Sequence, residues 1–122
     1  MTRTKSQSRR ADALRVSDME HSAALVDEVR TLGKTQFTSD RILQDAVLRR
    51  LEVLGEAAGH VSKATRDMFP GIPWNKIRGF TSFVKHEYWL VDLEQVWAAI
   101  EEMPSLRREL RQVRVKPPDR PV

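Results

Sequence analysis

The chain has 122 residues, of which 40% are hydrophobic and 31% charged, with a formal net charge of +4 and no cysteine. This length is typical of a single domain, and the lack of cysteine excludes disulfides and thiolate metal sites. No apolar run approaches the roughly 20 residues that span a bilayer, and the N-terminal MTRTKSQSRR has no apolar core of a secretory signal. We therefore expect a cytoplasmic protein with no membrane segment.

The positive charge lies at the two ends of the chain. Residues 1–15 carry five Lys or Arg and one acid, whereas residues 107–122 carry six Lys or Arg and two acids, so each end is +4 and the body is −4. The ends are either solubilising tails or arms that attract a polyanion such as RNA. We expect residues 1–10 and 114–122 to be disordered and residues 11–113 to form the folded domain.

Helix formers dominate the sequence and β-rich runs are absent, which predicts an all-α fold. A first helix is expected from Ala11 to Leu32, with Gly33 as its stop signal. Residues 34–38 should connect it to a second helix, which Ser39 or Asp40 can cap.

The second helix has the clearest pattern in the chain. Spacings of three and four residues define a seam of Leu43, Val47, Leu51, Leu54, Ala58 and Val61. Beside it lies a second apolar face of Ile42, Ala46, Val53 and Ala57. Two such faces predict packing on both sides, against another helix of this chain or against a second copy. Gly55 and Gly59 would allow close backbone approach.

Shorter elements follow. Residues 63–69 suit a short helix, and Pro73 is well placed to begin another, which we expect from about Trp74 to Tyr88. Asp92 predicts the N-cap of a further helix, and we expect Pro104 either to open a last helix or to bend this one. Together these elements predict an antiparallel bundle of four to five helices.

Few side chains offer chemistry. The three histidines are too scattered for a zinc site, and neither a Gly-rich phosphate loop nor a Gly-x-Ser-x-Gly elbow occurs, so we expect no metal and no cofactor. His86 can act as a general base or acid, or it can be a surface histidine favoured by the helix dipole. Arg78 lies about 80° around the expected helix from His86 and would place a cation in the same region.

Three separated blocks resemble the HepT-like branch of the HEPN superfamily: DAVLRRLEVLGEAA (45–58), IPWNKIRGF (72–80) and HEYWLVDLEQVW (86–97). The resemblance covers about residues 10–112. It implies an all-helical homodimer that is the toxin of a toxin–antitoxin pair, acting as a metal-independent endoribonuclease with tRNA among its substrate types. It also implies a small nucleotidyltransferase antitoxin as partner, which silences the toxin by transferring AMP to the motif tyrosine.

The family motif, R-x-x-x-x-H-x-Y, matches this chain only in part. Its histidine falls on His86 and its tyrosine on Tyr88, but Thr81 occupies the arginine position and Ser82 the polar position after it. RNA cleavage without a metal needs a base for the 2′-hydroxyl proton and a cation for the charge on the phosphorane. His86 can meet the first need, whereas Thr81 cannot meet the second.

Three explanations of the missing arginine stay open. Arg78 supplies the charge, or the chain is a weak or inactive member that still binds its partner or RNA, or the substitution was engineered or selected because an active toxin is hard to express. Tyr88 is a candidate AMP acceptor in all three, and its alternative role is a core aromatic that closes the helix end. Our leading hypothesis is a HEPN ribonuclease toxin, and the alternative is a non-catalytic dimeric module that binds a nucleotidyltransferase.

Overall fold

The computed structural model describes residues 4–85 and 91–115, and all regular structure in these two ranges is helical, as predicted. In chain order the elements are α1 (Lys5–Leu32), α2 (Lys34–Ser39), α3 (Arg41–His60), α4 (Lys63–Met68), α5 (Trp74–Arg78), the 3₁₀ turn η1 (Gly79–Thr81), α6 (Ser82–Lys85), α7 (Leu93–Glu101) and α8 (Met103–Val115). None of the helices in this part of the chain is long and apolar enough to cross a membrane.

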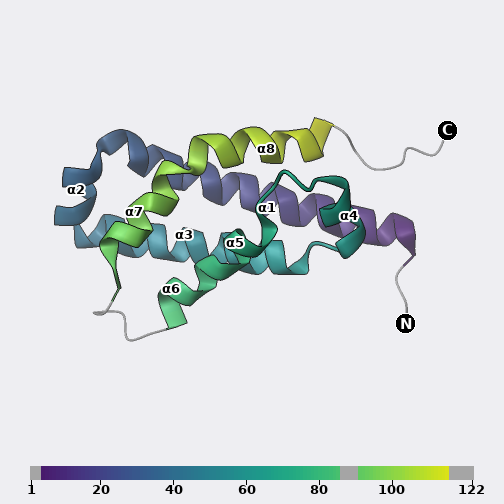
Figure 1. Cartoon of the computed structure of the whole chain (residues 1–122), viewed down its shortest axis with the longest axis horizontal. Coiled ribbons are helices and arrows are strands. Elements are labelled where there is room, and N and C mark those ends of the chain that lie inside the picture. Colours follow the sequence, from purple (N-terminus) through teal and green to yellow (C-terminus); the bar gives the residue numbers. More distant parts are fainter. Residues whose placement is uncertain (1–3, 86–90, 116–122) are drawn as a thin grey trace.

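Three long helices form the frame of the bundle. Helices α1 and α3 lie antiparallel, with α2 joining them at one end, and α8 runs antiparallel to α1 on its other side (Figure 1). The segment α5–η1–α6 crosses α3 in the opposite direction. The side chains that fill the interior are large and fully buried: Phe37, Met19, Leu51, Leu54, Ile77, Ile100, Met103 and Leu110.

Helix α1 begins earlier than its composition predicts. Thr4 and Gln7 form a capping box, in which Gln7 N donates to Thr4 Oγ1 at 3.1 Å and Thr4 N donates to Gln7 Oε1 at 2.9 Å. The expectation of a disordered tail over residues 1–10 is therefore wrong for residues 5–10, which form the first turns of α1. At the other end α8 continues to Val115, two residues past the expected boundary.

The connection between α1 and α3 is a short helix rather than a loop. Gly33 ends α1 as predicted, with a φ of 96° that favours glycine. The expected connector at residues 34–38 is instead the helix α2, because the fully buried ring of Phe37 anchors it against Trp97. Asp40 then caps α3, as predicted, by accepting from the backbone N–H groups of Ile42 and Leu43.

The two apolar faces of α3 differ in burial. The seam is in the core, where Val47, Leu51, Leu54, Ala58 and Val61 are buried and Leu43 is partly buried. On the second face only Ala57 is buried. Ile42 is 80% exposed, Ala46 is exposed and Val53 is half-buried. Within this single chain, α3 therefore leaves most of that face uncovered.

A buried carboxylate ties α1 to the start of α4. Asp12 is 4% exposed, and its Oδ1 accepts from the backbone N–H of Ser62 at 2.9 Å. Its Oδ2 accepts from the hydroxyls of Ser62 and Thr65, both at 2.6 Å. Because the single carboxylate of Asp12 accepts from all three donors, the network holds the turn after α3 against α1.

Candidate functional site

The motif segment is three short turns rather than one helix. The expected continuous helix from Trp74 to Tyr88 is wrong, because α5 ends at Arg78, η1 follows at Gly79–Thr81, and α6 covers Ser82–Lys85. His86 and Tyr88 lie outside the described residues, so their predicted roles stay predictions. Arg78, Thr81 and Ser82 are described.

Backbone carbonyls near Gly79 account for the tightened turn. The hydroxyl of Thr81 donates to the carbonyl of Arg78 at 3.0 Å, and the hydroxyl of Ser82 donates to the carbonyl of Gly79 at 2.7 Å. Such bonds to the carbonyl three residues back compete with regular helix geometry. They also occupy the Thr81 hydroxyl proton, so this side chain offers neither a cation nor a free donor.

Aromatic and apolar side chains fix the segment on the bundle. Trp74 is buried, and its indole N–H donates to the carbonyl of Phe69 at 3.0 Å. Ile77 and Phe80 are buried, and the rings of Phe80 and Phe83 stack with centroids 6.1 Å apart. Because η1 is anchored on both sides, the position of Thr81 is well defined.

Gly55 of α3 lies directly beneath this turn. A Cβ added at Gly55 would lie 2.7 Å from Thr81 Cγ2, 3.0 Å from the carbonyl oxygen of Ile77 and 3.1 Å from Thr81 N. Real Cβ atoms essentially never approach another atom within 3.0 Å. The prediction of close approach at Gly55 is therefore confirmed, and the neighbour is the position that the family motif gives to arginine.

Arg78 is exposed and lies over the C-terminal end of α3. Its Nε is 3.9 Å from where a Cβ on Gly59 would be, an ordinary contact distance. Arg78 and Thr81 therefore face different parts of α3, near Gly59 and Gly55 respectively. Among the described residues of this segment, Arg78 and Lys76 are the cations whose side chains can be placed, and Lys76 pairs with Glu102.

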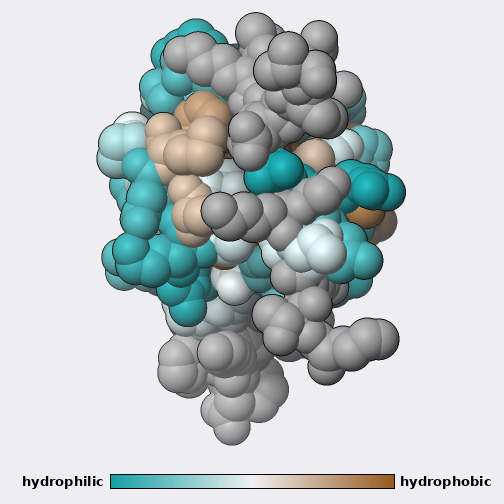
Figure 2. All heavy atoms as spheres, turned by 90° about the vertical axis from the view of Figure 1, so that its right-hand side faces the viewer, coloured by the Kyte–Doolittle hydropathy of each residue, from teal (hydrophilic) through white to brown (hydrophobic). Residues whose placement is uncertain are grey.

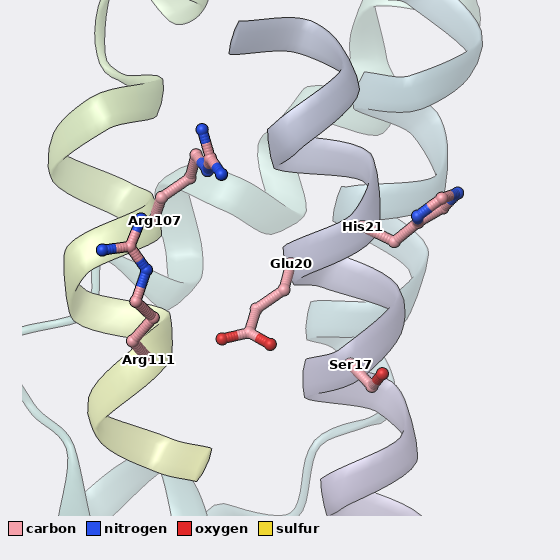
Figure 3. A pocket seen from close by; sticks show the side chains of 5 residues that line it. All are labelled: Ser17, Glu20, His21, Arg107 and Arg111. Atoms are coloured by element: carbon pink, nitrogen blue, oxygen red, sulfur yellow. The ribbon is translucent and has the colours of Figure 1, made fainter. Parts of the chain in front are cut away.

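A second polar feature, which sequence reasoning missed, lies between α1 and α8. An open cleft of about 430 Å³ is lined by Ser17, Glu20, His21, Arg107 and Arg111. Glu20 and Arg107 project into the space between the helices and Arg111 lies along α8 beside them, whereas His21 and Ser17 leave α1 on the side away from α8 (Figure 3). The i, i+4 spacing of the two arginines is a signal that could have indicated a shared face.

Asp27 fixes one of these arginines. Arg107 Nη1 donates to Asp27 Oδ2 at 2.7 Å, and Arg30 Nε donates to Asp27 Oδ1 at 2.6 Å. Burial raises the pKa of Asp27, but the hydrogen bonds and charges of the two arginines outweigh it, so the pKa lies below its ordinary value. The carboxylate therefore stays ionised and holds the guanidinium of Arg107 in place.

In the described part of the chain, no three His, Asp or Glu side chains gather closely enough to hold a metal ion. His21 and His60, which are both described, lie on different helices.

Comparison with known proteins places the chain in a family. The HepT-like family model, described as "Ribonuclease HepT-like", matches residues 19–113. Among curated relatives, "Putative RNase TTE0752" of Caldanaerobacter subterraneus is 30% identical over 73% of this chain and 80% of its own length. "Probable ribonuclease HepT" of Thermococcus cleftensis is 29% identical over 81% of this chain and 92% of its own.

A third relative, "Putative RNase MJ1380" of Methanocaldococcus jannaschii, is 25% identical over 75% of this chain and 85% of its own length. No solved structure matches the chain at a significant level. The family match covers α3, the whole motif segment and α8 as far as Val113, as the resemblance of the three sequence blocks predicts. The chain therefore belongs to the HepT-like ribonuclease family.

Proposed function

We propose that this protein is a HEPN-type endoribonuclease toxin that cleaves RNA, with tRNA as a candidate substrate, without a divalent metal. The observation that carries the proposal is the family match across residues 19–113, which includes the motif histidine and tyrosine. The names of the relatives, which describe ribonucleases, support the same activity.

In the proposed reaction His86 is the general base. It takes the proton of the 2′-hydroxyl, and the resulting oxyanion attacks the adjacent phosphorus to form a 2′,3′-cyclic phosphate. The P–O5′ bond to the next nucleotide breaks, and the leaving 5′-oxygen takes a proton from water. A guanidinium stabilises the charge that develops on the phosphorane. Arg78 is the candidate for this role, since Thr81 has no charge and its hydroxyl donates to a backbone carbonyl.

The proposed regulation acts on Tyr88. A nucleotidyltransferase antitoxin transfers AMP to the phenol oxygen, with pyrophosphate leaving from ATP, and so adds a bulky anion to the motif. Mass spectrometry of the protein co-expressed with its neighbouring nucleotidyltransferase tests this step. An AMP adduct on Tyr88 that the Tyr88→Phe variant lacks is the expected result.

The proposed assembly is a homodimer in the cytoplasm. The uncovered face of α3 supports it, because Ile42 is 80% exposed and Ala46 beside it is also exposed. An apolar groove of about 330 Å³ between α1 and α3 adjoins that face and includes Leu25, Val29 and Ala46. Apolar surface of this kind on a small protein commonly marks an interface.

Cleavage of RNA by the purified protein in EDTA tests the proposed activity. Wild-type protein is expected to cleave and His86→Ala to be inactive at unchanged thermal stability. Cleavage that EDTA abolishes, or that survives His86→Ala, would contradict the mechanism.

The alternative function is a non-catalytic dimeric module that binds the nucleotidyltransferase. The engaged, uncharged side chain of Thr81 at the arginine position favours it. The variant Thr81→Arg separates the two functions. Toxicity gained on expression indicates an enzyme weakened by the substitution, whereas unchanged growth together with retained partner binding indicates a scaffold.

A further inference from the structure

The basic stretches at residues 5–15 and 107–115 lie at the same end of the bundle. Residues 5–15 carry four Lys or Arg against one acid, and residues 107–115 carry four Arg against one acid. The structure places both stretches on helices, α1 and α8, which lie antiparallel, so that the start of α1 and the end of α8 are at the same end (Figure 1). Most of the positive charge that the sequence places at the two ends of the chain therefore lies on the neighbouring helices α1 and α8.

The surface of this end is suited to a charged partner. Figure 2 faces it, and the part of that surface which the structure describes is mainly hydrophilic, broken by a small apolar patch. Arg10, Arg108 and Arg111 are exposed. The acid of the α1 stretch, Asp12, is buried and accepts three hydrogen bonds, so it faces the interior rather than the surface.

The cleft between α1 and α8 is lined by two arginine side chains, Arg107 and Arg111. Arg107 and Arg111 are four residues apart on α8 and share one face. Asp27 orients Arg107 through one N–H of its guanidinium, and the Arg107 side chain remains 34% exposed. A guanidinium presents five N–H donors in a fixed fork that matches phosphate oxygens, so most of the donors of Arg107 remain for a ligand.

We infer that this cleft and the adjoining basic surface of α8 bind the phosphodiester backbone of RNA, at a place separate from the motif segment on α3. Among the described residues that line the cleft, none is a Phe, Tyr or Trp on which a base could stack. The surface would therefore bind RNA by its charge rather than by its sequence. The inference rests on the proposed function, since it assigns a second contact for the same substrate class.

Glu20 gives the inference a sharp test, because its carboxylate projects into the same space as Arg107. A bound phosphate would be repelled by this charge, so neutralising Glu20 and neutralising Arg111 should change affinity in opposite directions. If the two side chains served only to hold α1 and α8 together, both substitutions would act in the same direction. Arg111 is preferred to Arg107 for the test because Arg107 also anchors α8 through Asp27.

The experiment measures binding of a fluorescent 2′-O-methyl RNA to the full-length protein at several salt concentrations. The methyl group blocks the nucleophilic hydroxyl, so binding is separated from cleavage. Arg111→Gln is expected to weaken binding by about three- to tenfold and to reduce the slope of log K against log salt by about 0.7. Glu20→Gln is expected to tighten binding, equally for oligonucleotides of different sequence.

The matched control is Lys34→Gln, which removes one positive charge on α2, at the far end of α1, where Lys34 pairs with Glu94. It should leave the affinity close to that of the wild type, and circular dichroism should show all three variants folded. An Arg111→Gln effect no larger than that of Lys34→Gln overturns the inference, as does weaker binding by Glu20→Gln. Cleavage of unmodified RNA by His86→Ala is measured in parallel, so that failure of the proposed function is seen independently.

Discussion

Gly55 of α3 lies so close to Thr81 of the motif segment that a Cβ added at residue 55 would lie 2.7 Å from the Thr81 methyl group. Two of the three nearest atoms are the backbone oxygen of Ile77 and the backbone nitrogen of Thr81, which cannot rotate away as a side chain can. Gly55 therefore sets how close the motif segment lies to α3. Thr81, which the predicted motif alignment puts at the arginine position, therefore lies next to that glycine.

Gly55→Ala is expected to destabilise the protein by about 1–2 kcal/mol, because overpacking outweighs the gain in helix propensity. Urea unfolding measures the change. Gly59→Ala is the matched control on the same helix, since its Cβ would meet only Arg78 Nε at 3.9 Å, and it should be neutral or slightly stabilising. Adding Thr81→Ser to Gly55→Ala removes the nearest methyl group and should recover part of the loss. A Gly55→Ala protein as stable as the wild type would contradict this account.

Arg78→Gln tests whether Arg78 supplies the missing cation. If its guanidinium stabilises the phosphorane, kcat should fall by about 10²-fold with KM little changed. Steady-state cleavage of a labelled RNA measures both constants. Lys76→Gln is the control, because Lys76 is also an exposed cation of α5 but pairs with Glu102. Equal rates for Arg78→Gln and the wild type would remove Arg78 from the mechanism.

Ile42→Glu should convert the proposed dimer to a monomer without unfolding it. A charge placed at an apolar interface is costly to bury, whereas a glutamate in the first turn of α3 suits the helix dipole. Light scattering after gel filtration measures the mass. Leu14→Glu, at an apolar residue of α1 that is 68% exposed, is the control and should keep the wild-type mass. A wild-type protein that is monomeric at high concentration would contradict the proposed assembly.

Asp27 should make stability depend on acid pH. Its pKa is lowered in the folded protein, so it contributes stability above the ordinary aspartate pKa of about 3.9, and this is lost as the pH falls through the lower, folded-state value. We expect the two ion pairs of Asp27 to contribute about 1–2 kcal/mol to the free energy of unfolding, because both arginines are roughly one-third exposed and solvent screens their charges. Urea unfolding from pH 7 to pH 3 should show a smaller loss for Asp27→Asn than for the wild type. Asp67→Asn, which alters an exposed pair with Lys63, should follow the wild-type profile.

The sequence predicted best those features that depend on neighbouring residues. The seam of α3, the stop at Gly33 and the caps at Asp40 and Asp92 are all confirmed, since each follows from spacing or from a side chain bonding its own backbone. The start of α1 was not predicted, because the polar and basic residues 1–10 suggest disorder, whereas the Thr4–Gln7 capping box begins the helix there.

Features that depend on residues distant in sequence could not be predicted. The partners of Asp12 are 50 and 53 residues away, and Arg107 is 80 residues from Asp27. The close approach of Thr81 to Gly55 likewise brings together two separate helical segments, which spacing alone does not reveal. For the same reason the cleft between α1 and α8 emerged only when the two ends of the chain were brought together.

The packing of α8 on α1 also affects when the protein can fold during its synthesis. Val16, Met19, Ala23 and Val26 of α1 are fully buried in the finished bundle, where α3, α8 and α7 all pack on that helix. Before α8 has been synthesised, the side of α1 that it covers has no partner, and a product stopped before Met103 would leave that side open to proteases and chaperones. The contact between α1 and α8 can therefore form only after translation has passed Val115.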